Sequence, residues 1–475
     1  MKTYKKIKIG WVALAIAAIL PISCKKQLDT EYRSNLGPEY FLTADGLQAG
    51  LNASYATTRF FWGSEGFTSS QVAGTDEVVR GGDGGLDFHN YTNINAQNGT
   101  IQGVWDNSFV PINNLNGILE FGLQANITEA RRAQLLGEAK FLRAFYYFLL
   151  VQTFGDVPLK LKYNNTPSTE DVRTPKKDVY AAIIKDLTEA TAQLGNIQPG
   201  VSKGRASKAA AIHLLAKVYL TKGWDPDTRE GDGTPDFNKA YDTAIGLINA
   251  RASYGVDLET NFADIFKEGN EYGKEALFVA DRNTDPIYSE SGFNNTGAPA
   301  GGNKENRLNC YYTCFYTLTR NVNEGIPGAP VVNAQLAARD QVGGRPYRRF
   351  RPTQYTYDAF SNMDNDARYD ATFQKEWIMN LPSVQDNNFQ TTTPAFTTTR
   401  NGVAVTPTKG VDAAIWMPGR EVTVAERQAF KGVIIAPSQY SVEWFPTMIK
   451  FMDRTKAHFN DASDRPIILM RLGET

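Results

Sequence analysis

A few short patterns in this 475-residue chain contain residue types that catalyse reactions in other proteins. Gly200-Val-Ser-Lys-Gly204 has the spacing of a hydrolase nucleophile, which needs a strained turn between a strand and a helix of an α/β sheet. Gln198-Pro199 and a helical pattern precede it here, so an ordinary turn is the better interpretation. The three histidines, His89, His213 and His458, show no zinc-binding spacing. We therefore predict no catalytic residue.

Two other clusters could hold a metal or a disulfide. The loop Asp225–Asp232 offers carboxylates, but its spacing misses the helix–loop–helix calcium motif and places Arg229 at a ligand position. Calcium is thus a minor alternative there. Cys310 and Cys314 lie four residues apart, which leaves both a disulfide and a pair of small buried side chains open. Because no histidine lies nearby, two thiolates do not make a closed zinc site. We predict no metal and no cofactor.

Aromatic and amide side chains in polar segments suggest the binding of sugars. Phe, Trp and Tyr make up 12% of the chain. The C–H face of a sugar ring stacks on an aromatic ring, and its hydroxyls hydrogen-bond to Asn, Asp, Gln and Arg. Each of the candidate rings could instead be packed in the core. By region alone, the predicted ligand contacts are Trp62, Phe88, Tyr91, Asn93, Tyr288, Phe293 and Asn294, with Asn90 and Asn295 beside them.

Amphipathic helices between residues 40 and 251 are expected to carry these segments. In residues 136–158, apolar side chains recur at three- and four-residue steps until Gly155 and Pro158 end the helix. Small residues alternate with large ones, as in tetratricopeptide pairs, which we place at about 130–194 and 205–251. Further helices are expected at 40–59, at 105–119, at 175–194 with Thr174 as cap and Pro175 in its first turn, at 205–223 with Ser207 near its start, and at 237–250.

The second half of the chain has another character. From about residue 252, Gly, Asn, Thr and Pro dominate and helical periodicity is brief. Long irregular stretches in a compact protein are usually functional. We therefore predict a mainly α fold in which tetratricopeptide-like hairpins form a scaffold (40–251) and a loop-rich region (252–475) carries most of the ligand surface.

The N-terminus predicts export and a lipid anchor. Several lysines precede an uncharged, mostly apolar stretch, Ile9 to Ile22, which has the length of a signal peptide and is short for a membrane-spanning helix. Leu20-Pro-Ile-Ser-Cys24 resembles a bacterial lipobox, although Pro21 stands where Leu is usual. Residues 1–23 are thus predicted to be a signal peptide, Cys24 the lipidated residue and 24–39 a tether. Ordinary secretion with an incidental Cys24 is the alternative.

The charge balance argues against nucleic acid as a partner. Lys and Arg number 50 against 51 Asp and Glu, which gives a net charge of −1. No excess of positive charge is available to neutralise a phosphate backbone. The one basic run, Arg345–Arg351, is short and interrupted, and a solvated loop explains it better than a phosphate site.

Several strings resemble the SusD/RagB family in family order. Glu138-Ala-Lys-Phe-Leu-Arg-Ala-Phe-Tyr-Tyr-Phe148, followed by Phe154-Gly-Asp-Val-Pro-Leu159, is similar to the family's signature helix. The resemblance implies an outer-membrane, cell-surface glycan-binding lipoprotein without enzyme activity, which delivers oligosaccharide to a TonB-dependent SusC-type transporter. The helical half is then the expected docking face. Further landmarks are Asp178-Val-Tyr180, Gly204-Arg-Ala-Ser-Lys-Ala-Ala210, Arg351-Pro-Thr353, Asp366-Ala-Arg368 and Phe445-Pro-Thr-Met-Ile-Lys-Phe451.

One feature departs from the family pattern, and two other functions stay open. Asp464–Thr475 resembles the first turns of a family helix that normally continues. We therefore expect the chain to stop before the terminal family helices, as a truncated sequence or a shorter member, with apolar surface exposed. An exported glycoside hydrolase and a surface helical-repeat adhesin without sugar binding are the alternative functions.

Overall fold

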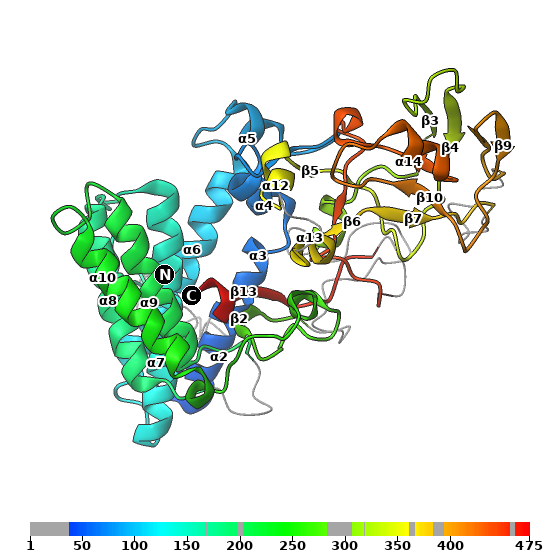
Figure 1. Cartoon of the computed structure of the whole chain (residues 1–475). Helices are drawn as coiled ribbons and strands as arrows, with labels where there is room; N and C mark the ends of the chain where they lie inside the picture. The colour runs from blue at the N-terminus through cyan, green and yellow to red at the C-terminus, as the bar shows by residue number, and fades with distance from the viewer. Residues whose placement is uncertain are drawn as a thin grey trace, which may run out of the picture.

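The computed structural model describes residues 38–166, 169–196, 203–282, 306–317, 319–360, 366–382, 394–456 and 461–475. Within them the protein is mainly helical, with several small sheets. Long helices pack together at one end of an elongated molecule, and short strands and loops form the other end (Figure 1). This division matches the predicted scaffold and loop-rich region.

Helices occupy the segments where apolar periodicity predicts them. The helix expected at 40–59 is divided in two at Thr57. The one expected at 105–119 starts six residues earlier, at Gly99, where Asn98 caps it. The helices of the first half are η1 (Pro38–Leu42), α2 (Ala44–Ala56), α3 (Thr58–Phe61), α4 (Glu65–Val72), α5 (Leu86–Asn90), α6 (Gly99–Phe121), α7 (Glu129–Phe154), α8 (Lys176–Gln193), α9 (Lys208–Trp224), α10 (Thr234–Asn249) and η2 (Arg251–Tyr254).

The two predicted helix caps have different outcomes. Ser207 caps α9 as expected, because its hydroxyl accepts a hydrogen bond from the Ala210 N–H (3.2 Å). The prediction for Thr174 is wrong. Pro175 is the residue before α8, and the Lys176 N–H donates instead to Asp156 Oδ1 (2.8 Å). Thr174 itself forms a β-bridge with Val157, so a partner distant in sequence replaces the local cap.

Helix α7 is the centre of the helical end. It packs against α6 on one side and α8 on the other, and α9 and α10 form the next antiparallel pair (Figure 1). Its apolar face is buried as the spacing predicts, with Leu135, Ala139, Leu142 and Tyr146 at 0% exposure. The helix ends at Gly155, whose φ of +70° suits glycine. The pairs α7–α8 and α9–α10 correspond to the predicted tetratricopeptide-like hairpins.

Polar residues of α7 are buried beside this core and connect it to its neighbours. Arg143 donates through Nε and NH2 to both carboxylate oxygens of Asp186 on α8 (2.8 Å each) and through NH1 to Asn116 Oδ1 on α6 (2.8 Å). Tyr147 Oη donates to the Lys160 carbonyl and accepts from the Lys160 N–H. A buried charge needs such partners. The most recognisable string of the sequence therefore holds the scaffold together.

The second half contains more regular structure than its composition indicates. Its elements are η3 (Phe262–Phe266), β2 (Ala276–Ala280), α11 (Leu308–Tyr311), β3 (Thr319–Val322), β4 (Val332–Gln335), β5 (Phe350–Pro352), α12 (Gln354–Asp358), α13 (Arg368–Thr372), β6 (Phe373–Gln374), β7 (Glu376–Ile378), β8 (Thr398–Arg400), β9 (Val403–Val405), β10 (Ala413–Trp416), α14 (Val424–Ala429), β11 (Val433–Ile434), η5 (Pro437–Gln439), β12 (Thr447–Met448), β13 (Ile467–Arg471) and η6 (Leu472–Glu474). Most sheets have two strands, and β11-β10-β7 has three. A second apolar core, with Trp377, Phe445 and Trp444 at its centre, holds them together.

The last residues form a strand, which corrects the prediction of a starting helix. Strand β13 pairs antiparallel with β2, with Ile467 opposite Ala280 and Arg471 opposite Ala276. All five residues of β2 are buried, so β13 covers one edge of a strand that lies against the helical core. The partner is almost 200 residues earlier, which is why local sequence does not reveal the pairing.

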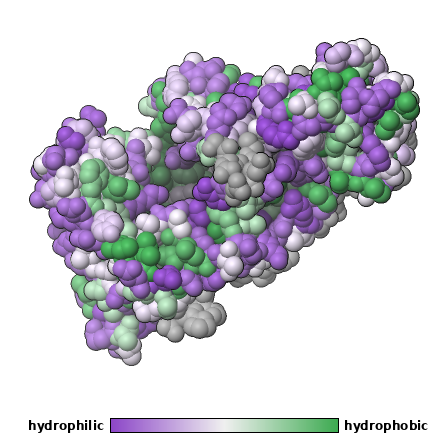
Figure 2. All heavy atoms as spheres, in the orientation of Figure 1, coloured by the Kyte–Doolittle hydropathy of each residue, from purple (hydrophilic) through white to green (hydrophobic). Residues whose placement is uncertain are grey.

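Within the described ranges, no helix combines the length and the apolar character needed to cross a bilayer. The visible face of the molecule is mainly hydrophilic, with apolar residues gathered over the α9–α10 pair (Figure 2). Leu220, Trp224 and Tyr241 are among the exposed large side chains of that pair.

Candidate functional site

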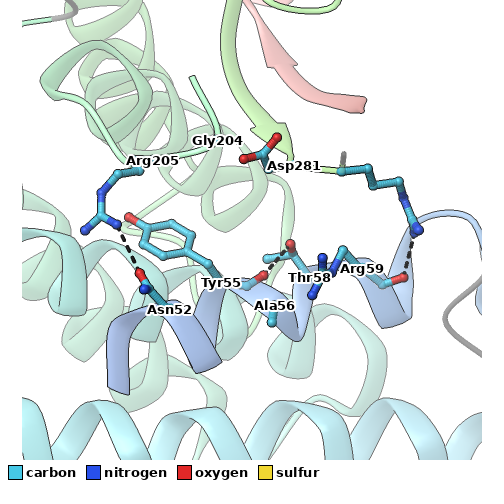
Figure 3. A pocket seen from close by; sticks show the side chains of 9 residues that line it. Asn52, Tyr55, Ala56, Thr58, Arg59, Gly204, Arg205 and Asp281 are labelled. Carbon is cyan, nitrogen blue, oxygen red and sulfur yellow. Dashed lines mark hydrogen bonds between the residues drawn. The ribbon is translucent and has the colours of Figure 1, made fainter. Parts of the chain in front are cut away.

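A polar pocket of about 270 Å³ lies where the helical end meets the second half. Helices α2 and α3 supply one wall through Asn52, Tyr55 and Arg59 (Figure 3). The opposite wall comes from two short connections, Gly204-Arg205 before α9 and Asp281-Arg282 after β2. Segments far apart in sequence thus bring cations, an acid and an amide to one hollow.

Buried hydrogen bonds fix one end of this pocket. The Tyr55 hydroxyl donates to Glu138 Oε2 (2.7 Å) and accepts from the Ala206 N–H (2.9 Å). Arg205 forms an ion pair with the same carboxylate oxygen (2.6 Å), and its guanidinium lies over the Tyr55 ring (5.2 Å to the centroid). Burial, and next the charge of Glu138, raise the pKa of Tyr55 well above its usual value, so the phenol stays protonated.

The other end is organised by Arg282 and Gly204. Arg282 NH2 donates to the carbonyls of Arg59 (3.1 Å) and Trp62 (3.0 Å) at the end of α3. A Cβ atom on Gly204 would lie 2.7 Å from the Asp281 side chain, so glycine permits this close approach. Figure 3 shows the Asp281 carboxylate above the helix wall, on the side of Gly204. Donors and acceptors both face the hollow, and hydroxyl groups can satisfy both because each can donate and accept.

The second candidate region surrounds α5 and holds three of the predicted ligand contacts, Phe88 on the helix and Tyr91 and Asn93 after it. Tyr91 follows α5 with a left-handed backbone (φ +55°), and its ring is 71% exposed. Its hydroxyl donates to the Gly74 carbonyl (2.8 Å), which holds the exposed ring in place. Asn93 is also left-handed (φ +54°) and exposed, and its Nδ2 donates to Asp87 Oδ1 (3.0 Å). Asn90 is exposed beside them. Strained backbone at exposed residues often accompanies function.

Trp62 and Phe88 occupy half-buried positions in aromatic clusters. The Trp62 ring contacts Phe61, Phe67 and Phe145 at centroid distances between 5.3 and 5.6 Å. Phe88 packs against the apolar cluster that contains Phe350. Both rings are therefore packed in the structure, which was the alternative to ligand contact in the sequence analysis. Ligand contact by them stays a prediction. Tyr288, Phe293, Asn294 and Asn295 lie outside the described residues, as does Cys24.

The acidic loop, the two cysteines and His213, which the sequence analysis considered for metal binding, disulfide formation or catalysis, have other partners in the structure. Lys176 Nζ contacts Asp225 (2.7 Å) and Asp227 (2.8 Å), so a lysine takes the place that a cation would need. Cys310 and Cys314 are buried free thiols, which is the packed alternative. His213 Nδ1 lies 2.9 Å from Thr475 Oγ1. Among the described residues, no group of His, Cys, Asp and Glu is arranged to hold a metal ion.

The sequence did not indicate the pocket residues Tyr55 and Arg205, or their buried partner Glu138, as site residues. Glu138 and Arg205 do fall in two of the recognised strings, Glu138–Phe148 and Gly204–Ala210. That these strings meet in space was not visible, because they are separated by about 65 positions of helix and connection. Tyr355 on α12, 64% exposed, was also missed.

Comparison with known proteins finds similarity to SusD-like proteins. Residues 71–220 match the SusD-like family whose description is "starch-binding associating with outer membrane". SusD-like protein P2 of Formosa agariphila is 31% identical over 288 residues, which are 58% of this chain and 53% of the relative. Starch-binding protein SusD of Bacteroides thetaiotaomicron is 29% identical over 152 residues, 32% of this chain and 25% of the relative. The chain spans about half the length, or less, of the curated relatives it matches.

Solved structures share the fold. A laminarin-binding SusD-like protein superposes with a TM-score of 0.59 at 21% identity, over 91% of this chain and 78% of the other. A SusD homologue from Bacteroides thetaiotaomicron gives a TM-score of 0.61 at 18% identity, over 92% of this chain and 73% of the other. The signature helix α7 and the first tetratricopeptide-like pair lie within the residues that match the SusD-like family, and the chain as a whole is similar in fold to SusD-like proteins.

Proposed function

We propose that this protein binds oligosaccharide at the outer surface of the cell, without cleaving it, and delivers it to a TonB-dependent SusC-type transporter. The observation that carries the proposal is the exposed Tyr91 ring, held by its hydrogen bond to Gly74 within a polar segment of a SusD-like fold. A fixed, solvent-exposed ring can stack on a sugar face without first paying a large ordering entropy.

Two regions support the proposal chemically. Tyr91 and Asn93 offer a ring and an amide on the exposed α5 segment. The pocket of Figure 3 offers Asn52, Arg205 and Asp281 as hydrogen-bonding groups for hydroxyls. The relatives' names mention starch and laminarin, which are both glucans with many hydroxyls and no charge. These two polysaccharides are therefore the first ligands to test.

Affinity gel electrophoresis tests the binding. The gels contain starch, laminarin, xylan or galactomannan as neutral polysaccharides, and alginate, pectin or carrageenan as acidic ones. We expect at least one gel to retard the protein. Tyr91→Ala and Asp281→Asn should weaken that retardation, whereas Tyr241→Ala and Asp242→Asn, exposed residues of α10, should leave it unchanged. If none of the seven gels retards the protein, glycan binding is contradicted and the adhesin alternative gains support.

Incubation with the bound polysaccharide separates binding from hydrolysis. We expect no increase in reducing ends over a day, because binding alone breaks no glycosidic bond. A steady release of reducing ends by purified protein would instead favour the glycoside hydrolase. A catalytically dead hydrolase standard and an active one, measured in parallel, define the two limits.

Tests of the membrane location and of the delivery to a transporter have to be done in the natural host. We propose that Cys24 carries the lipid and that the helical half contacts the transporter, as the resemblance implies. Cys24→Ser should release the protein from the outer-membrane fraction. Co-purification of the wild-type lipoprotein from detergent-solubilised outer membranes should yield a TonB-dependent barrel, and deletion of the barrel gene should abolish glycan uptake while binding to cells persists.

A further inference from the structure

Two exposed tyrosines from distant parts of the chain are attached to one surface turn, Gly74–Glu77. Tyr91 follows α5 and is 71% exposed, and Tyr355 lies on α12 and is 64% exposed. Helices α5 and α12 lie close together at the top of Figure 1, between the helical end and the strands of the other end. That part of the surface is largely hydrophilic in Figure 2.

Helix α5 packs directly on the first residue of this turn. Gly74 has a φ of +79°, and a Cβ there would lie 2.9 Å from the Phe88 carbonyl oxygen, so only glycine admits α5 this closely. The hydrogen bond from Tyr91 Oη to the Gly74 carbonyl (2.8 Å) then fixes the phenol end of the ring. The first tyrosine is thus positioned by the start of the turn.

Helix α12 is attached to the other end of the same turn. The Thr353 N–H donates to the Glu77 carbonyl (2.9 Å), and strand β5 before it pairs with β1 (Val78–Arg80), with Pro352 opposite Val78. The Thr353 hydroxyl bonds to the Asp76 carbonyl, and its oxygen also caps α12. Within α12, Tyr357 is buried, which directs Tyr355 to the opposite, solvent side of the helix.

The charged groups of the turn itself and of α12 are acidic, whereas the two paired strands beside them carry arginines, Arg80 on β1 and Arg351 on β5. Asp76 and Glu77 on the turn and Asp358 on α12 are all exposed. In the part of the chain that the structure describes, none of these three carboxylates forms an ion pair with Lys or Arg. Carboxylates accept hydrogen bonds from hydroxyls and repel anions such as sulfate esters and uronates. Asn90 and Gln354 add exposed amides next to the rings.

We propose that Tyr91 and Tyr355 form one aromatic pair that binds an uncharged, extended oligosaccharide across the turn Gly74–Glu77. The inference rests on the proposed glycan binding and adds the class of ligand and a contact from the second half of the chain. Because the rings are attached to opposite ends of a segment that spans up to about 10 Å, a chain of sugars lying along the turn can touch both. The carboxylates between them select hydroxyl groups over anionic ones.

The experiment uses the seven polysaccharides of the affinity gels, and then oligosaccharides of two to eight sugars prepared from the one retained most strongly. Tyr91→Ala, Tyr355→Ala and the double variant are compared with Tyr241→Ala, whose side chain is 66% exposed on the distant helix α10. All four replace exposed rings, so equal melting temperatures are expected and any loss of affinity is a loss of contact. Isothermal titration calorimetry measures the affinity.

The expected result is retention by a neutral polysaccharide, affinity that rises with chain length, and a loss of about tenfold for either single variant. The length dependence should flatten in both single variants, because each leaves one ring. Retention by acidic polysaccharides alone would overturn the inference while leaving glycan binding intact. So would a Tyr355→Ala affinity equal to that of Tyr241→Ala. Retention by none of the seven would instead overturn the proposed function itself.

Discussion

The helical end and the distal lobe bury charged side chains in different ways. The helical end, α6 to α10, places Arg143 and Asp186 on two long helices that pack side by side, and both carboxylate oxygens are bonded. The distal lobe comprises the described residues between 314 and 445 that pack around Trp377 and Trp444. There Arg400 on β8 forms an ion pair with Glu324 of the β3–β4 connection (2.6 Å) and also bonds to the Phe430 and Gly432 carbonyls.

The difference follows from how well each region satisfies the hydrogen bonds of its own backbone. Long helices satisfy their own backbone groups, so a buried arginine on α7 is free to join neighbouring helices through side chains. Strands of two to four residues leave many carbonyls without ladder partners, and a buried guanidinium with five N–H donors can collect them. Arg427, buried on α14, does the same for the Ile434 carbonyl (3.1 Å). Buried arginines thus bond to side chains of neighbouring helices in one region and to backbone carbonyls of loops in the other.

The largest effect is expected from breaking the ion pair of the helical end. Arg143→Met leaves Asp186 and the amide oxygen of Asn116 buried without their donor, which should reduce the free energy of unfolding by about 3–5 kcal/mol. Urea denaturation followed by circular dichroism measures it. Arg143→Met with Asp186→Leu should recover part of the loss, because no carboxylate then stays unpaired. A loss below 1 kcal/mol for the single variant would show that the pair does not hold the helices.

The corresponding change in the distal lobe should be slightly smaller and local. Arg400→Met removes the partner of buried Glu324 and the donor to two carbonyls, for which we expect about 3 kcal/mol. Hydrogen exchange read by mass spectrometry should show faster exchange in β8, β10 and β11 and unchanged exchange in α7. Lys409→Met, an exposed neighbour in sequence, is the control. Faster exchange in α7 as well would mean that the two regions unfold together.

The same contrast explains how far sequence reasoning reached. Helices α7, α9 and α10 were predicted because apolar spacing and caps such as Ser207 are local features. The distal core was missed, since its strands are short and their partners distant. Trp377 of β7, for example, pairs with Ile415 of β10. The strand β13 was taken for the first turns of a helix for the same reason.

The residues of the candidate site also differ in whether local sequence or distant contacts decide their exposure. Tyr91 was predicted from its polar surroundings, and the structure exposes it. Trp62 has similar surroundings in sequence, but Phe67 and Phe145 contact its ring, and Phe145 is more than 80 residues away. Tyr355 and Tyr357 lie on a five-residue helix, and no local pattern indicates which of them faces solvent. Which ring is free is therefore a property of tertiary packing.

A smaller effect, dependent on pH, is expected at the helical end. Burial, and then the charge of Lys217, lower the pKa of His213 to about 4. The unfolded chain therefore binds a proton near pH 6.5 that the folded chain does not, so stability falls as pH decreases from 6.5 towards 4. At pH 5 this amounts to about 2 kcal/mol. The difference in unfolding free energy between wild type and His213→Gln should change by this amount from pH 7.5 to 5, and a constant difference would contradict it.

The smallest effect compares one helix cap from each region. Ser207 caps the 17-residue helix α9, which is packed in the main core, and Thr423 caps the six-residue helix α14 within a capping box with Glu426. Ser207→Ala should cost about 1 kcal/mol of global stability, since α9 unfolds only with the core. Thr423→Ala removes an equally good local bond from a short helix with only Arg427 buried, so it should mainly speed hydrogen exchange in 424–429. Equal losses of global stability would mean that the distal lobe is as cooperative with the core as the helical pairs are.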